Sequence, residues 1–144
     1  MQWGFDSSLR DIESVACDPV NNVIYIAQEE AKVVTAFRFP LQEGDWDVDD
    51  FGNRALILLY QFPIIYDAGD SKSGIEGMTV DTKENLLCLV NEKHPKVFYK
   101  YQSNGVLRNE TYPNYSGDLS GVCYDEVLNL FWFVSDQSER YVIR

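Results

Sequence analysis

The feature that most constrains this chain is an internal repeat. Three segments, residues 11–29, 74–92 and 118–136, align with no gap, and successive copies begin 63 and 44 residues apart. Each copy holds a short apolar run that ends at an aspartate, then a turn and a second apolar run that ends at an acidic residue. Gap-free agreement of this kind predicts one structural unit that occurs three times.

Each unit has the pattern of short β-strands. Apolar runs bounded by turn residues are typical of strands, and the second run of each copy is apolar enough for burial on both faces. We expect first strands over 12–17 and 75–80, third strands over 33–39, 97–101 and 141–143, and fourth strands over 55–62 and 106–112. Helical patterns are nearly absent, so the sequence predicts an all-β fold.

Four antiparallel strands repeated in this way are typical of β-propeller blades, with the first strand at the central channel and the fourth outermost. We expect blades over 11–62, 74–112 and 118–144, the first with an acidic insertion at 42–53. Propellers close with about 4–8 blades, and the third unit stops inside its third strand. We therefore expect the remaining blades to come from a missing part of the chain or from a second copy. A β-sandwich is the alternative fold, although a sandwich need not repeat internally.

The composition excludes some classes of function but does not identify one. The 144 residues include 12 basic and 23 acidic side chains, and the net charge of −11 argues against a nucleic-acid partner, because phosphate binding needs a basic face. No apolar run approaches the roughly 20 residues of a transmembrane helix, and no signal peptide is visible. The cysteines lack metal-ligand spacing, so we expect Cys17, Cys88 and Cys123 to be buried free thiols.

The blade motifs carry a family resemblance. The strings GIEGMTVD at 74–81 and VNEKHPK at 90–96 resemble a blade of the SdiA-regulated family of six-bladed propellers. DLSGVCYD at 118–125 with FVSDQSER at 133–140 resembles the blade that follows, and DIESVACD at 11–18 with AQEE at 27–30 the blade before. More distantly, the pattern is similar to NHL-type, phytase-like and gluconolactonase-like propellers, some of which use calcium. The resemblance implies a six-bladed ring and an extracellular, periplasmic or cell-envelope setting.

The first candidate site is formed by Glu13, Glu76 and Ser120, which hold equivalent positions at the start of the inner strands. Neighbouring blades would bring these side chains to one mouth of the channel, where carboxylates suit a hard cation such as Ca²⁺. In gluconolactonase-like propellers an acidic residue before a glycine binds metal here, so the resemblance implies Glu76, and in part Glu13, as metal ligands. Ser120 offers a hydroxyl instead. The alternative is that these side chains bond backbone amides of the next blade or face channel water.

The second candidate site is formed by Glu29, Glu92 and Asp136, at the end of each second strand. Because strands one and two are antiparallel neighbours, we expect Glu29 beside Glu13 and Glu92 beside Glu76. Carboxylates so close together raise a pKa or bind a cation, and Lys93 could neutralise Glu92. We predict these three acids, with Lys93 and Ser120, as ligand-binding residues. Salt bridges and turn caps at the blade ends are the alternative.

Two further features are weaker. The acidic segment 45–52 resembles the start of a calcium loop, but an EF-hand requires Gly at the sixth position and Glu at the twelfth, where this chain has Asp50 and Leu56. A solvated acidic loop is the alternative. The single histidine, His94, lies in a predicted turn, and no nucleophile–base motif accompanies it, so no catalytic residue can be named.

Three functions follow from these features. The first is a propeller that binds an unidentified small molecule or protein, with Ca²⁺ as the expected cofactor. The second is a calcium-dependent hydrolase of the phytase or lactonase type, against which stands the shortage of basic residues to hold phosphate. The third is a structural half-propeller that assembles with another chain.

Overall fold

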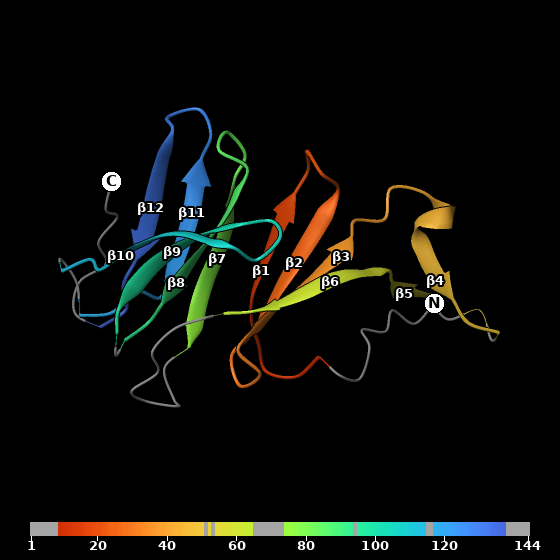
Figure 1. The fold of residues 1–144 in the computed structure, drawn as a ribbon, viewed down its shortest axis with the longest axis horizontal. Helices are drawn as coiled ribbons and strands as arrows, with labels where there is room; N and C mark the ends of the chain where they lie inside the picture. Colours follow the sequence, from red (N-terminus) through yellow and green to blue (C-terminus); the bar gives the residue numbers. More distant parts are fainter. Residues whose placement is uncertain are drawn as a thin grey trace.

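The computed structural model describes residues 9–50, 52, 54–64, 74–93, 95–114 and 117–137. Two four-stranded antiparallel sheets and a third two-stranded sheet follow one another along the chain (Figure 1). The first contains β1 (Ile12–Asp18), β2 (Val23–Gln28), β3 (Val33–Arg38) and β6 (Leu58–Pro63). The second contains β7 (Ile75–Asp81), β8 (Leu86–Asn91), β9 (Val97–Gln102) and β10 (Leu107–Thr111), and the third β11 (Gly121–Asp125) and β12 (Leu130–Val134).

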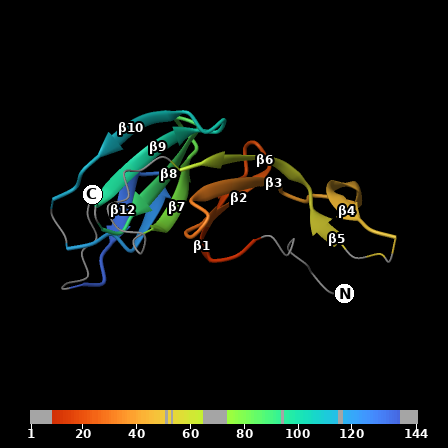
Figure 2. The same cartoon turned by 60° about the horizontal axis from the view of Figure 1, so that its bottom comes forward.

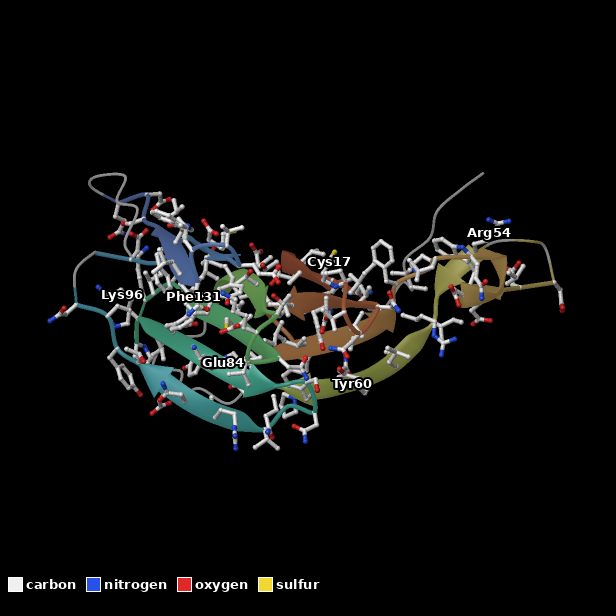
Figure 3. The ribbon with its side chains drawn as sticks, turned by 90° about the horizontal axis from the view of Figure 1, so that it is seen from above. Cys17, Arg54, Tyr60, Glu84, Lys96 and Phe131 are labelled. Atoms are coloured by element: carbon white, nitrogen blue, oxygen red, sulfur yellow. The ribbon has the colours of Figure 1, made fainter. Side chains whose placement is uncertain are left out.

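The order of the strands within each sheet is that of a propeller blade. The sheets run β1-β2-β3-β6 and β7-β8-β9-β10. Within each of these sheets the strands therefore follow one another in chain order from one edge to the other. The first strands β1, β7 and β11 lie side by side, and Figure 3 shows the blades as a curved row. The predicted all-β fold, built of four-stranded propeller blades, is confirmed.

One turn recurs between the first two strands of every blade. The carboxylates of Asp18, Asp81 and Asp125 each accept hydrogen bonds from backbone amides two or three residues ahead, at 2.9 to 3.1 Å. Four residues after each aspartate stands an asparagine with positive φ: Asn22, Asn85 and Asn129. Asparagine tolerates this left-handed conformation better than other residues with side chains. The aspartates that mark the repeat therefore shape its turns.

The second strand of the middle blade is buried on both faces, as predicted. Its side chains alternate: Leu87 and Leu89 join the core shared with the first blade, whereas Cys88 and Val90 face β12. Phe98 on β9 extends this second core, with ring centroids 5.1 Å from both Phe131 and Phe133. The apolar cores therefore lie between blades, and the two blade interfaces hold the arc together.

The expected fourth strand over 55–62 is wrong in its first part. Ala55 and Leu56 belong to β5 (Arg54–Leu56), which pairs with β4 (Trp46–Val48) in a separate hairpin. The register of β3 against β6 shifts between Ala36 and Phe37. Ile57 stands between β5 and β6, and its carbonyl accepts a hydrogen bond from the amide of Arg38 at 2.9 Å. The acidic insertion is therefore a short 3₁₀ turn, η1 (Glu43–Asp45), followed by this hairpin.

The expectation of three buried thiols is also wrong for two of them. Cys88 is buried, and burial raises the pKa of its thiol to about 12. Cys17 and Cys123 are exposed. Each lies on an inner strand next to a residue that packs toward the middle blade, so strand alternation turns the cysteine to the opposite face. Among the described residues, no helix is long and apolar enough to cross a membrane.

Candidate metal and ligand site

Carboxylates from all three blades gather at one end of the inner strands. Antiparallel pairing places the start of each first strand beside the end of the second, as in the pairing of Ile12 with Gln28 and of Ile75 with Asn91. The acidic residues that flank these strand ends form what we call the acidic rim: Asp11, Glu13, Glu29, Glu76, Glu92, Asp118 and Asp136. The two rows of acidic residues predicted from the repeat thus lie at the same end of the blades.

The densest part of the acidic rim belongs to the first blade. Asp11, Glu13 and Glu29 each present a carboxylate oxygen within 4.8 Å of the others. The backbone amide of Glu29 donates to the Asp11 carbonyl at 3.1 Å, and the amide of Glu30 donates to Asp11 Oδ2 at 3.0 Å. These bonds hold Asp11 in place, and the expected approach of Glu13 to Glu29 is confirmed. Three oxygen donors at this spacing could share one hard cation.

The side chain of Glu29 crosses the boundary to the second blade. A Cβ added to Gly74 would lie 1.9 Å from Glu29 Cγ and 2.3 Å from Glu29 Oε1. Gly74 therefore leaves the space that Glu29 fills. In the repeat, Gly74 stands where the other two blades have Asp11 and Asp118. Sequence reasoning missed this contact, although a glycine that replaces an aspartate in one copy was the signal.

The electrostatics of the acidic rim connect the blades. Partial burial raises the pKa of Glu29, and the charges of Glu13, Asp11 and Glu92 raise it further, partly offset by Lys32. Burial also raises the pKa of Glu76, as do the charges of Glu92, Glu13, Glu29 and Asp136. The pKa of Glu76 is thus raised by carboxylates of all three blades. Such mutual repulsion favours either protonation or a bound cation.

In the third blade, a buried aspartate organises the rim. Asp118 has 0% exposure, Ser120 Oγ donates to its Oδ2 at 3.0 Å, and Ser135 Oγ donates to its Oδ1. Burial alone would raise the pKa of Asp118, but hydrogen bonds from Asp136, Ser135 and Ser120 lower it to about 2. The same bond to Asp118 raises the pKa of Asp136. The two carboxyls are hydrogen-bonded to each other, and Ser120 supports Asp118. Sequence reasoning missed Asp118 and Ser135.

Lys93 adds a positive charge to the rim in the second blade, as Lys32 does near Glu29 in the first. It forms an ion pair with Glu92, and this hydrogen bond raises its pKa, as do the charges of Glu92, Asp118 and Asp136. Lys93 therefore lies in the field of the second and third blades together. His94 and the predicted strand over 141–143 lie outside the described residues.

The acidic insertion lies at the other end of the first blade. Asp45 Oδ2 accepts hydrogen bonds from the amides of Leu41 and Gln42, both at 3.0 Å. Trp46–Val48 then enters the hairpin. The carboxylate that would open a calcium loop instead closes a turn of its own backbone. The structure has a hairpin where the sequence analysis allowed a calcium loop or a solvated loop.

Without a divalent cation, we expect the chain to lose stability as pH rises above about 4.5, the ordinary pKa of a glutamate. Raised pKa values of Glu29 and Glu76 mean that the folded state resists their ionisation, so their contribution is present at low pH and is lost as pH rises through those values. Asp118 acts in the opposite direction, but only as pH falls toward about 2.

Melting temperature measured against pH in EDTA checks this expectation. Glu76→Gln should reduce the fall of the melting temperature with rising pH. Glu126→Gln, at an exposed turn position, should not reduce it. A decline of equal size in both variants would contradict the shared field of the acidic rim.

The comparisons with known proteins give one family match. A protein-family model described as SdiA-regulated matches residues 6–143. A search of curated proteins found no match. The matched range includes every described strand and all residues of the acidic rim.

Proposed function

Because the chain belongs to the SdiA-regulated family, we propose that it is a ligand-binding or interaction β-propeller whose acidic rim holds a Ca²⁺ ion. The observation that carries this proposal is the approach of the Asp11, Glu13 and Glu29 carboxylates within 4.8 Å. Like charges brought so close destabilise an empty site and are compensated by a cation.

The donor set favours calcium over other metals. Zinc sites use histidine and cysteine, and neither residue occurs among the described residues of the rim. Calcium takes six to eight oxygen ligands in flexible geometry, and magnesium demands a stricter octahedron. Asp11, Glu13 and Glu29 would hold the ion, with Glu76 as a neighbouring carboxylate whose charge is only partly buried. These side chains would leave coordination positions for water or for a ligand.

A bound cation would change what the acidic rim can attract. Calcium would neutralise part of the negative field and present open positions to carboxylate, phosphate or hydroxyl oxygens of a ligand. Lys93, with Glu92, Asp136 and Ser120, would contact the same ligand from the second and third blades. Extracellular calcium modules bind with Kd of about 10⁻⁴–10⁻³ M. Such an affinity fits the extracellular or envelope setting that we propose.

Calorimetric titration with CaCl₂ tests the proposal. We expect saturable binding and a rise in melting temperature, and we expect Glu29→Gln to weaken binding by about tenfold or more, because it removes the central carboxylate of the cluster. Glu110→Gln removes an equal charge at an exposed position of β10 and should bind like the wild type.

Loss of one rim charge should also raise the stability of the metal-free chain, which separates a binding defect from misfolding. Absence of any calcium response in the wild type, or an equal response in Glu29→Gln, would overturn the proposal.

One observation favours a second candidate, a calcium-dependent hydrolase. Asp118 and Asp136 are hydrogen-bonded carboxyls whose pKa values are shifted in opposite directions, as in the carboxylate pairs of some hydrolases. Turnover of p-nitrophenyl phosphate or of small lactones in CaCl₂, lost in Asp136→Asn, would favour the hydrolase over a binding protein.

A further inference from the structure

The hairpin inserted in the first blade stands apart from the propeller. We call residues 42–56 the arm, which comprises η1, β4 and β5. In the described part of the chain, β4 and β5 pair only with each other, and neither apolar core includes a residue of the arm. Figures 1 and 2 show the arm extending beyond β3 and β6, and Arg54 marks it in Figure 3. Because the arm contributes no residue to the apolar cores, its side chains are available to bind a partner.

A cavity lies where the arm leaves the blade. It has a volume of about 480 Å³, and its lining combines the apolar side chains of Phe39, Leu41 and Leu59 with polar ones that include Arg38 and Asp45. Leu41 is 65% exposed, although the backbone of its own turn is fixed by Asp45. Phe39 and Leu59, which line the same cavity, are 37% and 38% exposed. Clustered exposed apolar side chains beside a cavity mark an interaction site more often than scattered ones do.

The charge of the arm indicates what it could bind. Residues 42–56 include five acidic side chains and one basic one. Asp47 and Asp50 are exposed. A second copy of this chain, with its net charge of −11, would bring further negative charge to the contact and is disfavoured. A nucleic acid or an anionic membrane is disfavoured for the same reason.

We infer that the arm and the cavity at its base dock a partner polypeptide that presents an apolar side chain flanked by lysine or arginine. The apolar side chain enters the cavity against Phe39, Leu41 and Leu59. The flanking cations lie against the arm and steer the encounter. A central apolar anchor with a charged rim is the usual arrangement of a small protein interface.

This docking surface does not depend on the acidic rim. The arm follows the end of β3 that pairs with Val23, whereas the rim lies at the end that pairs with Gln28. The two sites therefore occupy opposite ends of the first blade. Failure of the calcium proposal would leave the docking proposal intact, and the reverse also holds.

A random-peptide display library, selected on the immobilised wild-type chain, tests the inference. We expect the enriched peptides to carry an aliphatic or aromatic residue between basic residues. Synthetic copies of these peptides should bind Leu41→Ser at least tenfold more weakly than the wild type. Val127→Ser, at an exposed turn position of the third blade, should bind as the wild type does.

Peptide binding to two further variants tests the role of the arm's charge and the location of the binding surface. Asp47→Asn combined with Asp50→Asn should weaken binding several-fold and reduce its dependence on salt. Glu29→Gln, in the acidic rim, should bind the peptides as the wild type does. Selection of acidic peptides, equal binding to Leu41→Ser, or a wild-type chain that self-associates through the arm would each overturn the inference.

Discussion

Replacement of Gly77 by alanine is expected to lower the free energy of unfolding by about 2–3 kcal/mol. Gly77 lies on β7, and a Cβ there would stand 2.7 Å from the Cα of Gly121 and 2.8 Å from the amide nitrogen of Val122. Both atoms belong to the backbone of β11, so no side-chain rotation relieves the clash. The inner strands of the second and third blades would have to move apart.

Urea unfolding measures this loss, and Gly44→Ala is the matched control. Gly44 lies in the arm, and a Cβ added there would meet no atom within 4 Å. Its substitution should therefore change stability by less than about 0.5 kcal/mol. An equal small effect at both positions would contradict the close approach of β7 and β11.

The second large effect is expected for Leu89→Ala, which should cost about 2–5 kcal/mol. Leu89 is completely buried on β8 and belongs to the core between the first two blades. Truncation removes apolar contacts and leaves a cavity between two sheets that cannot easily close, because each sheet is fixed by its own hydrogen bonds.

Leu128→Ala is the control for this variant, since Leu128 lies in the turn after β11 and is 53% exposed. The free energy of unfolding of Leu128→Ala should lie within about 0.5 kcal/mol of the wild-type value. If unfolding of Leu89→Ala split into two transitions, the blades would be separate cooperative units. A single transition at lower urea would show that the interface joins them.

Protons and calcium should compete for the acidic rim. The raised pKa values of Glu29 and Glu76 arise from burial and from neighbouring carboxylates, and a cation among these groups would remove much of that repulsion. Calcium affinity should therefore rise with pH over the same range in which the metal-free chain loses stability.

Much of the candidate site could be located from the repeat, but its internal contacts could not. Alignment of the copies placed Glu13 and Glu76 at one strand end and Glu29 and Glu92 beside them, because antiparallel pairing follows from a short turn. The same alignment gave Ser120 no partner. Its hydrogen bond to Asp118 depends on the burial of that carboxylate beside Ser135, which the pattern of apolar residues does not encode.

The sequence by itself determined the blade: four strands in order, aspartate turns between the first two, and a second strand buried on both faces. These features are local, since strand alternation and turn chemistry act over a few residues. Only the tertiary structure decided how one blade meets the next. The contact of Glu29 with Gly74 and the contact of Gly77 with Gly121 depend on distances between sheets. No local pattern specifies those distances, because they follow from how all the side chains at an interface pack together.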